Sequence, residues 1–142
     1  MSDMPNNSDF ALAIARSALV DAFAATETAV ISRLVALQGE TNAMFSQNIA
    51  ALQKMKPESR YSKATKKDVD QALAELLEML PLRADIVHGC MRIVTLDGKS
   101  LACFSNPQKI AAYSRLACLI EEEQFDAARK KLLALAKIIS PA

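Results

Sequence analysis

The chain has few of the residues that usually carry chemistry or build β-structure. It has no tryptophan, 5% aromatic residues, three glycines and a single histidine, His88. It also lacks a glycine-rich phosphate loop, a Ser/His/Asp order and any spacing typical of metal ligands. These absences argue against P-loop, serine-hydrolase and zinc-site chemistry. They leave His88 as the only imidazole for acid–base chemistry, and we expect no metal and no cofactor.

Charge of one sign and long apolar runs are also missing. The formal net charge is +1, so an RNA partner would have to meet a local basic patch rather than a general field. No apolar run is long enough to cross a bilayer, and residues 1–8 lack the features of a signal peptide. Cys90, Cys103 and Cys118 are an odd number of thiols, so we expect them to be reduced in a cytoplasmic protein without membrane contact.

Length and periodicity predict one helical domain over residues 9–142, preceded by a disordered terminus over residues 1–8. Apolar residues recur at helical spacing in five segments. The first expected helix covers residues 9–38, with Ser8 as N-cap and Gly39 as stop. The second covers residues 41–55, with Met44, Phe45, Ile49 and Leu52 inside, and the third runs from about Thr65 past Pro81. The fourth starts at Pro107 and includes Leu119 and Ile120, and the fifth covers residues 125–139, with Leu132, Leu133, Leu135 and Ile139 inside.

One β-hairpin interrupts this pattern. Asp97-Gly98 separates the β-prone runs 91–96 and 99–104, which is typical of a type I′ turn. It is the only strand signal in the sequence. The predicted fold class is therefore all-α, a bundle of four to five helices with one small β-hairpin after the third helix.

Two opposite charges are placed among apolar helical neighbours. Glu27 has Phe23, Ala24, Val30 and Ile31 at three and four positions, and Arg83 has Met79, Leu80, Ile86 and Val87. A buried charge without a partner is costly, so we predict that Glu27 accepts a hydrogen bond from Arg83. The alternative for Glu27 is a helix rotated so that the carboxylate reaches solvent.

The segment Arg83-Ala84-Asp85-Ile86-Val87-His88-Gly89 contains the only constellation suited to catalysis. A histidine with a pKa near neutrality can transfer a proton, and an arginine can bind phosphate oxygens in a bidentate manner. Five positions on an ideal helix separate Arg83 and His88 by about 140°. A kink at Pro81, the helix end at Gly89 or a second copy of the chain would have to bring them together. The alternative is structural: His88 at a helix C-terminus and Arg83 in an ion pair.

This R-x4-H motif on a late helix, followed by glycine, resembles the HEPN superfamily. The similarity is specific over Leu82–Gly89 and loose over Asp9–Ile139. Arg-Asn-Asp-Ile-Val-His-Gly is a familiar form of the motif, and this chain departs from it by carrying Ala84 where the asparagine stands. The resemblance implies a HEPN-like helical bundle and a homodimer that brings two motifs together. It also implies a metal-independent endoribonuclease of toxin or phage-defence type, with RNA as substrate and an antitoxin as a candidate protein partner.

In that interpretation Arg83 and His88 are the catalytic residues, and Glu27 and Asp85 support them. The alternative is a catalytically inactive HEPN-like interaction domain that binds a protein partner, because Ala84 can neither donate nor accept a hydrogen bond from its side chain. Lysines between the second and third helices form the densest basic region. We expect Lys63, Lys66 and Lys67 to contact RNA phosphates there, although a solvated charge run would have the same appearance.

Overall fold

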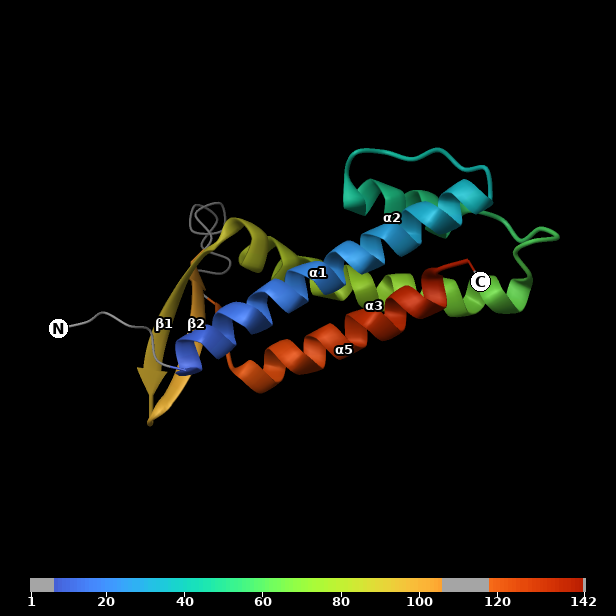
Figure 1. The fold of residues 1–142 in the computed structure, drawn as a ribbon. Helices are drawn as coiled ribbons and strands as arrows, with labels where there is room; N and C mark the ends of the chain where they lie inside the picture. Colours follow the sequence, from blue (N-terminus) through green and yellow to red (C-terminus); the bar gives the residue numbers. More distant parts are fainter. Residues whose placement is uncertain (1–6, 106–117, 142) are drawn as a thin grey trace. The chain divides into compact units, whose positions relative to one another are not determined.

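The computed structural model describes residues 7–105 and 118–141 of the chain (Figure 1). Its elements are α1 (Asn7–Ala36), α2 (Phe45–Lys54), α3 (Lys63–His88), β1 (Cys90–Leu96), β2 (Lys99–Ser105), β3 (Cys118–Ile120) and α5 (Glu122–Ile139). They form two compact units. The first contains residues 1–21 and 81–129, and the second contains residues 22–80 and 130–142. The unit boundaries fall within α1, α3 and α5.

The first unit is built around a three-stranded antiparallel sheet in the order β1-β2-β3. The β1–β2 hairpin pairs Cys90 with Ser105 and Leu96 with Lys99. Asp97 and Gly98 at its turn have φ of 50° and 76°, as a type I′ turn requires, so the predicted hairpin is confirmed. Buried side chains of the strands and helices of this unit form its core: Leu12, Leu19, Ile86, Leu101, Ala102, Phe104, Ile120 and Phe125.

The prediction of an all-α bundle is wrong, because a third strand completes a sheet in a mostly helical chain with four helices among its described residues. Leu119 and Ile120, expected in a fourth helix, belong to β3, where Ile120 pairs with Ala102. Their apolar spacing fits a helix, but pairing satisfies backbone groups that β2 would otherwise leave unpaired at a sheet edge. The rest of that expected helix lies outside the described residues.

The second unit is helical, and its core follows the predicted pattern. Phe23, Val30 and Leu34 of α1 are buried, as are Ile49 and Leu52 of α2. Val69, Leu73 and Leu76 of α3, and Leu132, Leu135 and Ile139 of α5, complete the core. Met44 and Leu133 were expected inside, but they are 57% and 42% exposed. Met44 precedes the first turn of α2, which begins four residues later than predicted.

Local hydrogen bonds explain where these helices begin and end. α1 ends in a Schellman motif, because the Gly39 N–H bonds to the Leu34 carbonyl at 2.8 Å and the Gln38 N–H bonds to the Val35 carbonyl at 3.0 Å. Gln38, not Gly39, takes the left-handed conformation there, with φ of 58°. α1 begins at Asn7, so residues 7 and 8 are helical rather than part of a disordered terminus.

The starts of α3 and α5 use side-chain caps. Ser62 accepts a hydrogen bond from the Thr65 N–H at 3.1 Å, so α3 begins at Lys63, two residues earlier than expected. The Glu121 N–H donates to the Gln124 side chain at 2.8 Å, and α5 starts at Glu122. The acidic residues Glu122 and Glu123 therefore belong to the first turn of the last helix, three residues before its predicted start, where negative charge suits the helix dipole.

Candidate functional site

The predicted motif occupies the last two turns of α3, in the first unit. His88 is the last residue of the helix and is exposed, whereas Arg83 is half-buried. Asp85, expected to support the motif, is only 2% exposed. Ala84, which stands between Arg83 and Asp85 in the sequence, is half-buried. The imidazole is thus exposed at the end of a helix.

Arg83 and His88 lie within one helix, and this limits how they can act together. Pro81 is inside α3 and precedes both residues, so a kink there cannot change the angle between them. On a regular helix that angle is about 140°. The two side chains could therefore be combined only by a second copy of the chain or by the helix end itself.

Gly89 explains why the helix stops directly after His88. Its N–H donates to the Asp85 carbonyl at 2.8 Å, which closes the last turn. A Cβ on this residue would lie 2.2 Å from the same carbonyl oxygen and 3.4 Å from the Cβ of Phe104. No larger residue fits without a backbone shift. A larger residue at position 89 would therefore strain the backbone where the chain passes from α3 into β1.

Arg16 of α1 contacts this helix end, and the sequence interpretation did not name it. Its Nε and Nη2 donate to the Ile86 carbonyl oxygen at 3.1 and 2.7 Å. Its guanidinium carbon lies 5.7 Å from the centroid of the Phe104 ring, within the range of a cation–π contact. Phe104 in turn meets Phe125 edge to face, with 6.2 Å between ring centroids. A signal did exist: the residues three and four positions from Arg16 are Leu12, Ala13, Leu19 and Val20, all apolar.

Glu27 is half-buried on the part of α1 that belongs to the second unit, while Arg83 belongs to the first. Both residues have interacting partners. The pairing of Glu27 with Arg83 stays a prediction.

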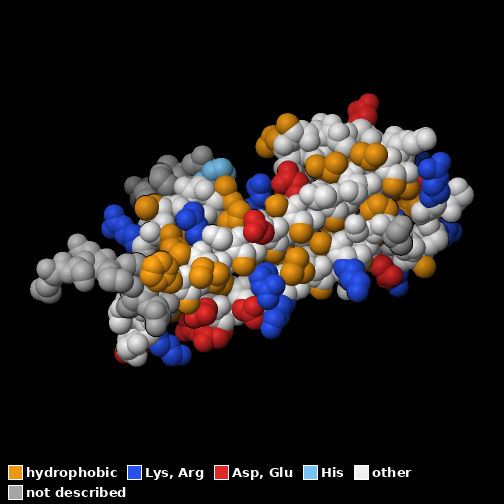
Figure 2. Space-filling view, in the orientation of Figure 1, with side chains coloured by type: hydrophobic (Ala, Val, Ile, Leu, Met, Phe, Trp, Pro, Cys, Tyr) orange, Lys and Arg blue, Asp and Glu red, His pale blue; other side chains and the backbone are white. Residues whose placement is uncertain are grey.

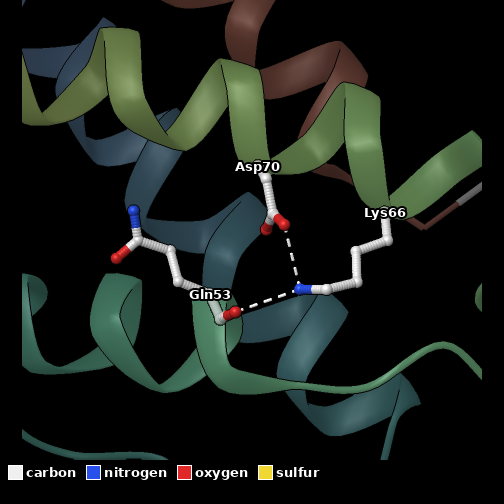
Figure 3. A network of polar contacts seen from close by, with 3 residues as sticks. All are labelled: Gln53, Lys66 and Asp70. Carbon is white, nitrogen blue, oxygen red and sulfur yellow. Dashed lines mark hydrogen bonds and ion pairs between the residues drawn. The ribbon is translucent and has the colours of Figure 1, made fainter. Parts of the chain in front are cut away.

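The three lysines expected to contact RNA lie at the start of α3, in the second unit, and they are not equivalent. Lys63 and Lys67 are exposed. The Lys66 ammonium instead donates to the Gln53 carbonyl at 3.0 Å and lies 2.9 Å from the Asp70 carboxylate (Figure 3). Two of its three donors are therefore used within the protein, which makes Lys66 a poor candidate for an RNA contact.

Tyr61 lies next to this network and is fully buried. Its ring is 5.9 Å from the Lys66 ammonium and 5.5 Å from the Arg33 guanidinium carbon. Burial, reinforced by the nearby Asp70 carboxylate, raises the pKa of Tyr61 to about 12, although the Arg33 charge acts in the opposite direction. The phenol is therefore neutral at physiological pH.

Over the described ranges, 7–105 and 118–141, no group of three or more His, Cys, Asp or Glu side chains is arranged to hold a metal ion. The three cysteines form no disulfide. None of the helices in this part of the chain is both long and apolar enough to cross a membrane.

A groove of about 670 Å³ lies in the first unit, and no residue of the motif lines it. The floor of the groove comes from Ala11, Ile14, Ala15 and Ala18 of α1, and its wall comes from the start of α5. Acidic side chains line that wall: Glu122, Glu123 and Asp126, the last in an ion pair with Arg129 at 3.0 Å. Figure 2 shows hydrophobic side chains at the surface over α1, with acidic side chains close by over the start of α5. Ile14 is 68% exposed and Phe10 54% exposed.

Comparisons with known proteins add no family to this description. No protein-family model matches the chain, and no curated protein or solved structure matches it significantly.

Proposed function

We propose that the chain is a HEPN-related protein that cleaves RNA without a metal, as a toxin or phage-defence nuclease, with Arg83 and His88 as catalytic residues. The observation that carries the proposal is the position of His88, exposed as the last residue of α3 and followed by a glycine that admits no side chain. An imidazole held at a helix end is accessible to a ribose hydroxyl and is attached to a backbone of fixed geometry.

The chemistry is attack of the ribose 2′-OH on the adjacent phosphorus. His88 accepts the 2′-OH proton as the 2′-oxygen–phosphorus bond forms and the bond from phosphorus to the 5′-oxygen breaks. The products are a 2′,3′-cyclic phosphate and a 5′-hydroxyl, and the departing oxygen needs a proton from a second acid. Arg83 stabilises the negative charge that develops on the phosphate oxygens. The exposed lysines Lys63 and Lys67 would bind the RNA backbone elsewhere.

A homodimer supplies the second acid, because each chain has only one histidine. It also combines an arginine and a histidine that point to different sides of one helix. Support comes from the exposed apolar side chains Phe10 and Ile14, which stand four positions apart on α1. Light scattering should give a dimer mass for the wild type and a monomer mass for Ile14→Glu. A wild-type monomer at high micromolar concentration would argue against the composite site.

The cleavage test uses purified protein, RNA and a chelator. We expect cleavage with a 2′,3′-cyclic phosphate end, lowered at least about 100-fold by His88→Ala and by Arg83→Ala. Lys131→Ala, an exposed charge removal on α5, serves as the matched control and should retain wild-type activity. Equal cleavage by the wild type and by both motif variants would reject the proposal.

One observation favours a second function, that of an inactive HEPN-related domain that binds a protein. The groove between α1 and α5 in the first unit has an apolar floor and an acidic wall. It suits an amphipathic helix whose apolar stripe is flanked by lysine or arginine, such as a segment of an antitoxin. The side chain of Ala84 makes no hydrogen bond in the motif, which is consistent with lost activity. A wild-type protein that cleaves no RNA, and binds such a helix in a manner abolished by Ile14→Glu, would favour this function.

A further inference from the structure

The last carbonyl groups of α3 need hydrogen-bond donors, and one of them finds its donor in a residue distant in sequence. The last carbonyls of a helix have no partner within the helix. The Asp85 carbonyl accepts from Gly89, but the next one, Ile86, would need the N–H of Cys90, which belongs to β1. Arg16, seventy positions earlier, donates to the Ile86 carbonyl instead, through both Nε and Nη2.

We propose that Arg16 is a positioning residue for His88, an assignment that rests on the proposed RNA-cleaving function. Its guanidinium is held on two sides, by the Ile86 carbonyl and by the face of the Phe104 ring. Ile86 is two residues before His88, so the direction of its carbonyl sets the course of the backbone on which the imidazole stands. The arginine itself touches no reacting atom in this role.

Phe104, which the Arg16 guanidinium faces, also lies beside the glycine that follows His88. A Cβ on Gly89 would lie 3.4 Å from the Cβ of Phe104, so the base of the Phe104 side chain lies beside the glycine. Phe104 also packs edge to face against Phe125 of α5. Arg16 before the histidine and Phe104 after it therefore fix both sides of one residue. Lysine could not replace Arg16, because an ammonium donates from a single atom and does not stack as a plane.

The single histidine allows a direct test on the full-length chain that does not depend on RNA cleavage. The imidazole Cε1–H gives one resonance in the wild type, and hydrogen exchange of the Gly89 amide reports on the last helical bond. In Arg16→Gln we expect the resonance to shift and broaden, and Gly89 exchange to accelerate at least about tenfold. Lys99→Gln, a charge removal at an exposed position of β2 in the same unit, should leave both unchanged.

Arg16→Lys is the second variant, and it decides the matter if Arg16→Gln does not fold. We expect it to fold, to keep the charge and still to show the altered His88 resonance and faster Gly89 exchange. Wild-type spectra and exchange in a folded Arg16→Gln, or full rescue by lysine, would overturn the positioning role.

RNA cleavage then separates this inference from the proposed function. If the wild type cleaves RNA, Arg16→Lys should lower kcat about tenfold and leave KM within about twofold, because Arg16 acts on the imidazole and not on binding. An unchanged kcat overturns the positioning role while the nuclease proposal stands. A wild type without activity rejects the nuclease proposal, and the His88 spectra then still report whether Arg16 orders the helix end.

Discussion

Arg16 and Arg33 lie on the same helix, one in each compact unit, and they make the same kind of contact at two different helix ends. Arg16 donates to the Ile86 carbonyl near the end of α3 and faces the ring of Phe104. Arg33 donates to the carbonyls of Ile139 and Ser140, at 2.9 and 3.0 Å, at the end of α5, and faces the ring of Tyr61. In both units an arginine of α1 donates hydrogen bonds to carbonyls at the end of a helix that is distant in sequence.

The two sites differ in burial and in the residues at the capped helix end. Arg33 is 8% exposed, and the helix that it caps leads into Ser140 and Pro141, neither of which is a catalytic candidate. Arg16 is half-buried, and the helix that it caps ends in the exposed His88. The same device thus serves stability in the second unit and, by our proposal, orientation of an imidazole in the first.

The largest expected effect comes from removing the more buried of the two arginines. Arg33→Ala leaves two carbonyls without their donor and should lower the free energy of unfolding by about 3 kcal/mol. Arg16→Ala leaves one partly buried carbonyl and should cost about 1.5 kcal/mol. Urea unfolding followed by circular dichroism measures both. A cost for Arg16→Ala equal to that for Arg33→Ala would show that the two contacts have the same structural weight.

Two glycines sharpen the comparison at the next level. A Cβ at Gly89, after α3, would lie 2.2 Å from a backbone oxygen, whereas a Cβ at Gly39, after α1, would lie 3.1 Å from the movable Cδ2 of Leu34. We expect Gly89→Ala to cost about 2 kcal/mol and Gly39→Ala less than about 1 kcal/mol. The same unfolding assay checks this difference. Gly89→Ala at wild-type stability would mean that the end of α3 relaxes freely.

The effect that is smallest at neutral pH concerns the rings that the two arginines face, one a phenylalanine and the other a tyrosine. The folded-state pKa of Tyr61 is raised to about 12 from the ordinary 10. The stability that its neutral phenol contributes is therefore fully present below about pH 10 and is lost as the pH rises towards 12. Tyr61→Phe should flatten the fall of unfolding free energy between about pH 10 and about pH 12.

The matching control for this prediction is already in the chain. The Tyr61 hydroxyl has no hydrogen-bond partner within residues 7–105 and 118–141, so Tyr61→Phe should be nearly neutral at about pH 7. Tyr113 is present in both proteins and its titration cancels in the difference. An identical alkaline loss of stability in wild type and variant would assign the effect to other groups.

Local chemistry could be predicted from the sequence, and partners from distant segments could not. Asp97-Gly98 fixes a type I′ turn by its own backbone preferences, so the hairpin was predictable. Leu19, Phe23, Val30 and Leu34 of α1 recur at helical spacing and are buried, although Val35 beside them is exposed. β3 was not predictable, because Cys118–Ile120 becomes a strand only by pairing with β2, and its apolar pattern fits a helix equally well.

Glu27 and Arg83 are not the only charges in the sequence with apolar neighbours at helical spacing. Charges whose neighbours at three and four positions are all apolar include Arg16 and also Arg33, which is flanked by Ala29, Val30, Ala36 and Leu37. Both arginines prove to have backbone carbonyls as partners, which no count of acidic residues would suggest. Lys66 was expected to contact RNA, but Asp70 four positions later already indicated an ion pair within the helix.

The two arginine contacts also set an order of events during synthesis of the chain. Arg16 and Arg33 emerge early on α1, but their acceptors follow seventy residues later for Arg16 and more than a hundred later for Arg33. Contacts of such high sequence separation form slowly, because the entropy of closing a long loop must be overcome first. During translation the α3 end and its histidine can be capped while the segment that pairs with Arg33 is still being made. Vectorial folding would thus complete the candidate catalytic end of the protein before the end of α5 is fixed.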